Sequence, residues 1–350
     1  MDKYLSEKIR VLSYILIVFV VFLHSYNLPK STIFILSLNS FIQNFISNGI
    51  TRIAVPLYFL ISGYLFFITL PSNLFDFSQK WKKRARTLVI PYLFWSIFGL
   101  LLYFILQIFP LFQSFFTHKL IRNYTYNDLF ETIFLNPIPY QLWFIRDLIV
   151  LVILAPIINY LFKRLSYLFL IILFSIWVLF PSIYLIASES ILFFSLGLFF
   201  AIKFQELLSF KISNKLFYAL LITYLFLLSV NTLLLVNFNY ISLYFVLHKM
   251  ILLLGILTLW FSYDILYAKS HKTISHLMPV TSFTFFIFAA HEPILTILKK
   301  TLLFQLKQIP DNSLITFLIA PLFTITICYF IAYVIKTIIP NFYFFITGSR

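Results

Sequence analysis

Ionisable side chains stand at five points inside or beside long apolar runs of this sequence. They are His24, Arg52, the pair Arg146–Asp147, the pair His248–Lys249 and the pair His291–Glu292. A charge in lipid is costly, so such residues usually serve a function. A neutral imidazole, with an ordinary pKa of about 6.5, can take a proton from a hydroxyl group, and an arginine can stabilise a developing oxyanion. The residues therefore indicate chemistry on a hydroxyl, with His24 as general base and Arg52 as its electrostatic partner.

Each of these positions also has a structural interpretation. His24 can hydrogen-bond a carbonyl of a neighbouring helix, and a helix-end Arg52 can extend to the membrane surface. Arg146 and Asp147 can pair with each other. Glu292 precedes Pro293, which frees a backbone carbonyl and can bend the helix. Ser62-Gly63 permits close approach of a ligand or of another helix. Both interpretations stay open at this stage.

The composition requires lipid to cover much of the chain. Hydrophobic residues make up 62% of the 350 residues and charged residues 11%, with a mean hydropathy of +0.99. In a soluble domain, about one half of the residues are apolar and about one quarter are charged. Long apolar runs also exclude an outer-membrane barrel, whose strands alternate every second residue. We therefore expect an all-α integral membrane protein with lipid as a partner.

The basic charge fits membrane topology better than nucleic-acid binding. The formal net charge is +15, but the Lys and Arg residues cluster in short segments between apolar runs, where they set orientation. No nucleic-acid partner is predicted. Cys328 is the single cysteine, and no cluster of acidic residues suggests a Mg²⁺ site. No metal site is therefore predicted.

Ten stretches are long enough to cross a bilayer, which takes roughly 20 apolar residues. They lie near 9–27, 50–70, 88–110, 142–162, 166–181, 184–202, 216–236, 242–263, 278–298 and 314–338. The fifth and sixth are short and are separated by Pro181. Most Lys and Arg residues fall on one side if both termini are cytoplasmic, and the run Lys80–Arg86 is the strongest anchor. His24, Arg52, Arg146, His248 and His291 then share the outer level of a single domain, 1–350.

The order of several blocks resembles the acyltransferase 3 family of membrane acyltransferases. The blocks are helix 1 ending in His24-Ser25, RIAVPLYFLISG at 52–63, KKRARTLVIPYLFW at 82–95, QLWFIRDLI at 141–149, FSLGLFFA at 194–201, TFFIFAAHEPIL at 284–295 and TGSR at 347–350. The resemblance implies ten helices in a bacterial inner membrane. It also implies transfer of an acyl group, usually acetyl, from cytoplasmic acyl-CoA to a hydroxyl of a surface or lipid-linked polysaccharide. The chain is similar in particular to the O-acetyltransferases of enterobacterial common antigen and exopolysaccharide.

In this family the catalytic histidine and arginine correspond to His24 and Arg52. Many members carry an Arg eleven residues before that His, where this chain has Ser13 and the nearest Arg is Arg10. Acyl-CoA is expected as the donor substrate, with no permanently bound cofactor. Lys82, Lys83, Arg84 and Arg86 can attract its phosphates, although this run also serves as a topology anchor. The residues expected to hold the substrates are Tyr58, Ser62, Trp143, Arg146, His291 and Glu292.

Two points of mechanism and function stay open in the sequence. The acyl group can pass directly to the hydroxyl or through an acyl-imidazole on His24. The alternative function is a transporter or flippase for a lipid-linked sugar or small solute, whose buried charges would line a pathway. No inverted repeat supports this alternative. A scaffold without chemistry is less favoured, because the loops leave little surface for a partner. The acceptor is not encoded in a recognisable motif, although loops 28–49 and 111–141 carry Asn, Gln and Tyr that suit sugars.

Overall fold

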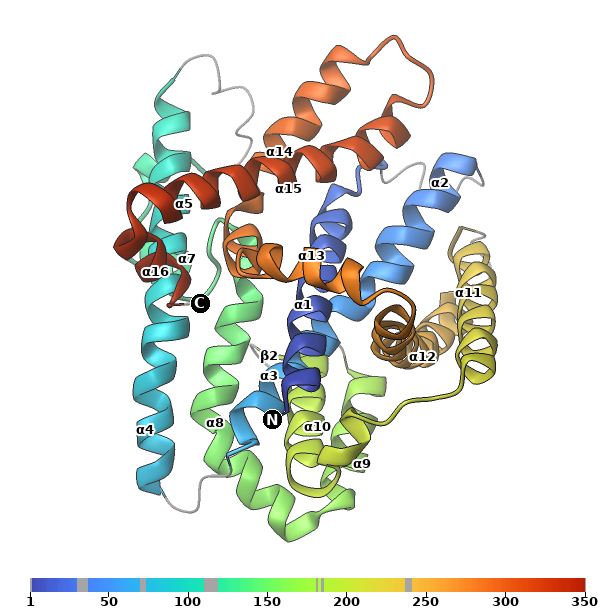
Figure 1. The fold of residues 1–350 in the computed structure, drawn as a ribbon. Helices are drawn as coiled ribbons and strands as arrows, with labels where there is room; N and C mark the ends of the chain where they lie inside the picture. The colour runs from blue at the N-terminus through green and yellow to red at the C-terminus, as the bar shows by residue number, and fades with distance from the viewer. Residues whose placement is uncertain are drawn as a thin grey trace. The chain divides into compact units, whose positions relative to one another are not determined.

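A computed structural model describes residues 2–29, 37–69, 74–109, 119–180, 182–183, 186–236 and 241–349. These residues are almost entirely helical, as Figure 1 shows. They divide into two compact units, 1–70 with 159–329 and 71–158 with 330–350. Two of the unit boundaries, at 158/159 and 329/330, fall inside long helices, α8 (Trp143–Leu165) and α15 (Asn312–Ile338).

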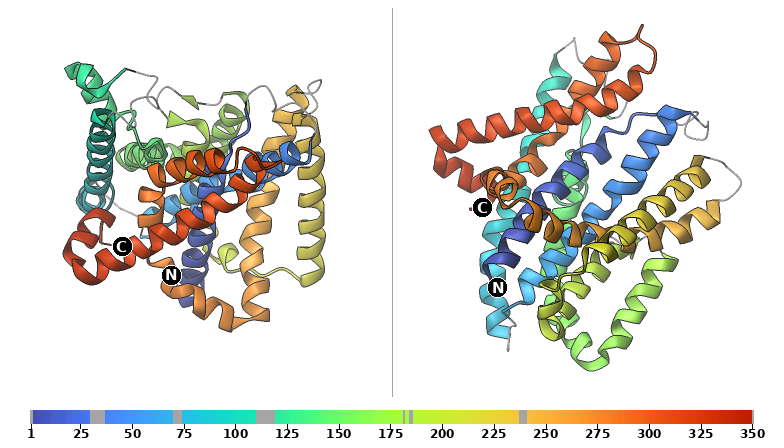
Figure 2. Two further views of the ribbon diagram at one scale, coloured as in Figure 1. Left: turned by 90° about the horizontal axis from the view of Figure 1, so that it is seen from above. Right: turned by 45° about the vertical axis from the view of Figure 1, so that its right-hand side comes forward.

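The first unit contains α1 and the helices that pack around it. Its elements are α1 (Lys3–Ser25), α2 (Leu38–Gln43), the π-helical turn η2 (Asn44–Gly49), the 3₁₀ turn η3 (Ile50–Ile53), α3 (Ala54–Phe67), α9 (Tyr167–Leu179), β1 (Ser182–Ile183), β2 (Ile186–Ala187), α10 (Ser188–Lys203), the 3₁₀ turn η7 (Gln205–Leu208), α11 (Asn214–Val236), α12 (Ile241–Lys269), α13 (His271–Thr281) and α14 (Thr284–Gln305). Helix α1 contacts α3, α12, α13 and α14. In Figures 1 and 2, α11 and α12 run side by side.

The second unit is built on one long helical stretch. Its elements are α4 (Leu74–Arg84), the π-helical turn η4 (Ala85–Val89), α5 (Ile90–Ile108), the 3₁₀ turn η5 (Ile121–Asn123), α7 (Tyr126–Phe134), the 3₁₀ turn η6 (Tyr140–Leu142) and α16 (Pro340–Thr347). Helices α7 and α16 both pack against α5. The Trp95 indole donates a hydrogen bond to the Ile346 carbonyl at 3.0 Å, which fixes α16 to α5.

The helices fit a multi-pass membrane protein. Among the described residues, seven helical stretches are long and apolar enough to cross a membrane, or eight if the bent pair α13–α14 forms one span. The seven are Lys3–Ser25, Leu38–Phe67, Phe75–Ile108, Tyr140–Leu165, Asn214–Val236, Tyr244–Lys269 and Asn312–Ile338. Large apolar side chains lie exposed along them: Ile222 and Phe226 of α11 are 67% and 65% exposed. Lipid tails can cover such an apolar surface, whereas its exposure to water would be unfavourable.

Each of the ten predicted spans coincides with helical structure, but fewer than ten of the described helices are long enough to cross a membrane. Each of the ten stretches overlaps a described helix, yet α9 has 13 residues and α10 has 16. A helix of that length reaches only about 20–24 Å, short of the hydrocarbon thickness of about 30 Å. Pro181, which was expected to separate the two, lies outside the described residues. The count of ten and the cytoplasmic termini therefore remain predictions.

Helices α3 and α10 touch through their backbones at two glycines. A Cβ placed on Gly63 would meet the carbonyl of Phe194, and one placed on Gly197 would meet the backbone of Leu60 and Tyr64. Backbone atoms cannot rotate away as a side chain does, so only glycine fits at either place. Small residues allow this close packing between helices in membranes. Of the two interpretations of Ser62-Gly63, close packing against another helix is therefore the one observed at Gly63.

Gly63→Ala is expected to destabilise the protein by about 1–3 kcal/mol, because α3 and α10 must separate to admit the methyl group. The measurement is the thermal unfolding midpoint of the detergent-solubilised protein. Gly49→Ala is the matched control, since its Cβ would meet only the end of the Leu228 side chain, at 2.6 Å from Cδ1. Equal midpoints for the two variants would contradict the backbone contact.

Candidate active site

His24 and His291 lie against each other in the first unit. His24 is in the last turn of α1, and His291 is in α14. Their rings are stacked with centroids 5.5 Å apart and planes inclined by 17°. His24 is half-buried, whereas His291 is fully buried. Two histidines that are 267 positions apart in sequence therefore form one stacked imidazole pair, and an imidazole ring can take up or release a proton.

Helix α14 is bent inside its length, next to His291. Glu292 has non-helical angles of φ −97° and ψ 133°, so the helix breaks directly after His291, next to Pro293. His291 Nδ1 lies 2.7 Å from the carbonyl oxygen of Phe288 and 3.2 Å from that of Ile287. These carbonyls belong to the preceding turn of the same helix. The ring orientation is therefore fixed by its own helix.

Lys299 joins α14 to the end of α1. Its ammonium donates to the carbonyl oxygen of His24 at 2.7 Å and to that of Tyr26 at 3.4 Å. The last carbonyls of a helix have no partner within the helix, and a lysine can satisfy them. The backbone that carries the His24 side chain is thus held by the helix that carries His291.

Arg52 is exposed in η3 and is held by a ladder of amide side chains. Its guanidinium donates to Asn48 Oδ1 at 2.8 Å, and Asn48 donates to Asn44 Oδ1 at 2.7 Å. Tyr26, just beyond α1, also donates to Asn44 Oδ1, at 3.3 Å. Steps of four residues place Arg52, Asn48 and Asn44 on one face of the helical segment. The ladder connects Arg52 to the end of α1 that bears His24.

The charge of Arg52 acts on three neighbouring groups. It is close enough to influence His24, His248 and Tyr244 electrostatically. The rings of Tyr244 and His248 are stacked in α12, with centroids 5.5 Å apart. The Lys249 ammonium, in contrast, donates a hydrogen bond to the backbone carbonyl of Trp177 and lies 4.7 Å from the centre of the Trp177 indole ring. His24, Arg52, His248 and His291 thus share a region of the first unit, while Lys249 is directed to α9.

Two other predicted substrate residues lie on α3. The Tyr58 hydroxyl donates to the backbone carbonyl of Ser13 and so ties α3 to α1. Ser13, the position at which the resemblance predicts an arginine in many members, takes part in this contact through its backbone carbonyl. Ser62 is half-buried and precedes Gly63 at the α10 contact. Tyr58 thus joins α3 to α1, and Ser62 lies beside the contact between α3 and α10. Their role in binding a substrate stays a prediction.

Trp143 and Arg146 belong to the second unit, at the start of α8. Arg146 pairs with the fully buried Asp147, with 2.9 Å between its Nη2 and Oδ1. Its Nη1 donates to the Leu135 carbonyl at 2.7 Å, at the end of α7. The pairing within Arg146–Asp147 is the structural interpretation left open by the sequence. Trp143 is half-buried at the first position of α8.

Side chains from α5 and α8 cap the end of α7. Ser96 donates to the Ile133 carbonyl at 2.9 Å and Tyr92 to the Phe134 carbonyl at 2.8 Å, next to the bond from Arg146. The start of α7 is held by Asp128, which accepts a hydrogen bond from Lys119 at 2.6 Å. That bond, together with the hydrogen bonds from the backbone N–H and hydroxyl of Thr125, lowers the pKa of the Asp128 carboxyl to about 2. Both ends of α7 are thus fixed within the second unit.

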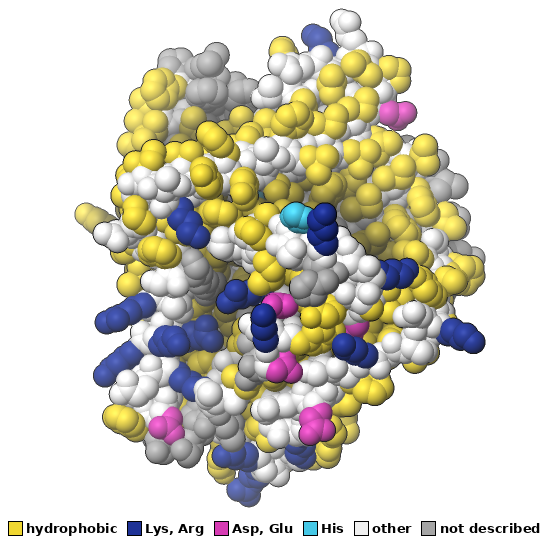
Figure 3. Space-filling model, in the orientation of Figure 1, with side chains coloured by type: hydrophobic (Ala, Val, Ile, Leu, Met, Phe, Trp, Pro, Cys, Tyr) yellow, Lys and Arg dark blue, Asp and Glu magenta, His cyan; other side chains and the backbone are white. Residues whose placement is uncertain are grey.

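The basic run lies in the helix that leads into α5. Lys82, Lys83 and Arg84 end α4 and Arg86 lies in η4, with Lys82, Lys83 and Arg86 exposed. Lys and Arg side chains gather on the left of the face in Figure 3. The sequence placed this run in a loop before a span at 88–110, whereas the helical stretch runs from Phe75 to Ile108. An exposed cationic helix face can attract phosphate groups.

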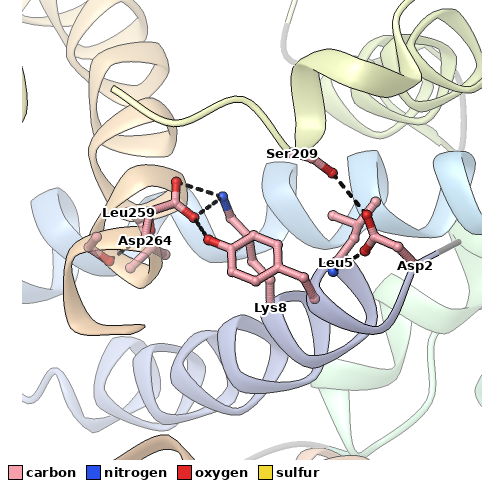
Figure 4. Close-up of polar contacts among 8 residues, drawn as sticks. Asp2, Leu5, Lys8, Ser209, Leu259 and Asp264 are labelled. Carbon is pink, nitrogen blue, oxygen red and sulfur yellow. Dashed lines mark hydrogen bonds and ion pairs between the residues drawn. The ribbon is translucent and has the colours of Figure 1, made fainter. Parts of the chain in front are cut away.

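A buried ion pair was missed by the sequence analysis. Lys8 of α1 donates to both carboxylate oxygens of Asp264 of α12, at 2.8 and 3.0 Å (Figure 4). The exposed fractions of the two side chains are 0% and 4%. The Tyr4 hydroxyl also donates to Asp264, and the Lys8 ammonium lies 4.6 Å from the centre of the Trp260 ring.

A signal for this pair was present in the sequence. Asp264 interrupts the apolar run ILTLWFSYDILYA, and a carboxylate in such a run needs a basic partner. Lys8 satisfies this need because α1 begins at Lys3, several residues before the predicted span.

The chain belongs to the acyltransferase 3 family. The family model, described as an acyltransferase domain, matches residues 7–333 and so covers nearly the whole chain. A curated relative is the succinoglycan biosynthesis protein ExoH of Rhizobium meliloti (strain 1021), which is 28% identical over 169 residues. That match spans 47% of this chain and 45% of ExoH, less than half of either protein. No solved structure matches the chain.

Proposed function

We propose that this protein is an O-acyltransferase of the bacterial inner membrane, with both termini cytoplasmic. It takes an acetyl or other acyl group from cytoplasmic acyl-CoA and transfers it to a hydroxyl of a surface or lipid-linked polysaccharide. The observation that carries the proposal is the stacked pair His24–His291 near the charge of Arg52, in a member of an acyltransferase family. Acyl transfer to an alcohol needs a proton acceptor and a group that stabilises an oxyanion, and this region supplies both.

The roles of the residues follow from their chemistry. His24 acts on the reacting groups, either by taking the hydroxyl proton or by carrying the acyl group as an acyl-imidazole. Arg52 stabilises the oxyanion at the acyl carbon. Lys82, Lys83, Arg84 and Arg86 attract the phosphates of CoA. No metal ion or bound cofactor has a step in this scheme.

A polysaccharide acceptor is supported by the name of the relative, which concerns succinoglycan biosynthesis. Near the end of α1, Gln43 and Asn27 form two hydrogen bonds, from Asn27 N to Gln43 Oε1 and from Gln43 Nε2 to Asn27 Oδ1, each at 3.1 Å. Such amides can also bind sugar hydroxyls. Gln43 belongs to α2, within the predicted loop 28–49, of which 30–36 lie outside the described residues. In the predicted loop 111–141, residues 111–118 also lie outside them.

The test uses membranes that contain the protein and acetyl-CoA labelled in its acetyl group. Label is expected in the glycan fraction, and it is expected to be absent from membranes of a strain without the gene. Glycan that changes sides of the membrane with no consumption of acetyl-CoA would support the transporter alternative and contradict the proposal.

Arg52→Lys is expected to lower the rate of transfer about tenfold or more, because lysine keeps the charge but loses the planar fork that binds an oxyanion and Asn48. The rate of glycan labelling at equal protein amounts measures the effect. Arg122→Lys, at an exposed arginine of η5, is the control and should keep the wild-type rate. A fully active Arg52→Lys would show that Arg52 only anchors the helix end.

A further inference from the structure

The hydrogen bonds of His291 fix the position of its ring proton. A carbonyl oxygen only accepts hydrogen bonds, and Nδ1 lies 2.7 Å from that of Phe288 and 3.2 Å from that of Ile287. Nδ1 therefore carries the proton in the neutral ring. Nε2 then holds a lone pair and can only accept a proton or a hydrogen bond.

Nε2 of His291 is buried and lacks a partner. Within the described part of the chain, no residue forms a hydrogen bond with this atom. Buried polar atoms are nearly always hydrogen-bonded in native proteins, so an unpartnered one needs an explanation. A ligand with a hydroxyl would supply the missing donor. His24, stacked on His291, is only half-buried, so a substrate at His24 also comes to the neighbouring ring.

The arrangement is the one that a general base requires. In acyl-transfer enzymes the basic nitrogen of a histidine faces the hydroxyl while the other nitrogen donates to an oxygen that fixes the tautomer. Here the carbonyls of Phe288 and Ile287 are those oxygens. They also stabilise the imidazolium that forms when Nε2 takes a proton.

We propose that His291 is a second catalytic histidine, whose Nε2 takes the proton of the acceptor hydroxyl. This inference rests on the proposed acyl transfer. The hydroxyl oxygen forms a bond to the acyl carbon while its O–H bond breaks and the proton moves to Nε2. In this step His24 carries the acyl group as an acyl-imidazole, and the acyl carbon loses its bond to the His24 nitrogen. The proton then passes from Nε2 to that leaving atom, so the histidine is neutral again.

Two variants separate the base from other roles of His291. His291→Asn retains an amide N–H near the position of Nδ1, which can still bind the two carbonyls, but it has no basic nitrogen. His291→Gln places an amide near the position of Nε2, which can hydrogen-bond a hydroxyl but cannot take its proton. A structural role predicts an active Asn variant, and a role limited to hydroxyl binding predicts an active Gln variant.

The experiment measures label transfer from acetyl-CoA to glycan in membranes that contain equal amounts of folded protein. Both variants are expected to lose about 10²-fold or more in rate, with thermal unfolding midpoints close to that of the wild type. A smaller loss in either variant, or a loss that follows a lowered midpoint, would overturn the assignment. If wild-type membranes transfer no label, the proposed function itself fails and the role of His291 falls with it.

Discussion

His24→Ala is expected to lower transfer of the acyl group to glycan by about 10²–10⁴-fold, whichever of its two proposed roles is correct. A general base contributes about this factor, because without it the hydroxyl must lose its proton to water. If His24 instead carries the acyl group, alanine removes the nucleophile and the loss is at least as large. The measurement is the amount of acyl ester on the surface glycan of cells that express the variant at the wild-type level.

The control for His24 is a histidine in a different environment. His276 is exposed in α13, so His276→Ala should leave glycan acylation unchanged. The thermal midpoint of His24→Ala should also stay near that of the wild type, because Lys299 binds the backbone carbonyl of His24 and this bond survives the substitution. Wild-type acylation in cells with the alanine variant would remove His24 from the mechanism.

Lys8→Met is expected to destabilise the protein by about 3–5 kcal/mol, because it leaves the Asp264 carboxylate buried without its cation. Among the described residues, the Tyr4 hydroxyl alone would then still donate to Asp264. The measurement is the thermal midpoint of the detergent-solubilised protein, together with the fraction that elutes as a single species in size-exclusion chromatography.

The double variant Lys8→Met/Asp264→Leu is the decisive comparison. It removes both charges and fills the space with apolar atoms, so most of the lost stability should return. The interaction energy between the two sites is the difference between the double change and the sum of the single changes. If the double variant is no more stable than Lys8→Met, the damage comes from lost packing and not from an unpaired charge.

The sequence predicted the level of a residue along its helix better than the direction in which its side chain points. A rise of 1.5 Å per residue places His24 and His291 at one level, and the structure stacks the two rings. The rotation of each helix about its axis depends on contacts with distant helices, which a single sequence does not encode. For this reason the carbonyl bonds of His291 and the link from Lys299 to His24 were beyond prediction.

Helix boundaries were the weakest part of the prediction. The second span was expected to begin at 50, but helical structure starts at Leu38 and passes through a π and a 3₁₀ turn before α3. The polar residues of this stretch bond one another, as Asn44 and Asn48 do, so low hydropathy did not end the helix. Arg146 likewise found its partners in Asp147 and the end of α7, which only tertiary structure could reveal.

The glycine contact between α3 and α10 restricts where a donor can travel. Phe194 and Gly63 meet through main-chain atoms, so no side chain can swing aside to open a passage between these two helices. In the proposed mechanism, a flexible donor arm such as pantetheine would therefore pass along another seam of the first unit to reach His24. Since a passage between α3 and α10 would have to break this main-chain contact, an opening for an acyl chain is expected between other helices of the unit.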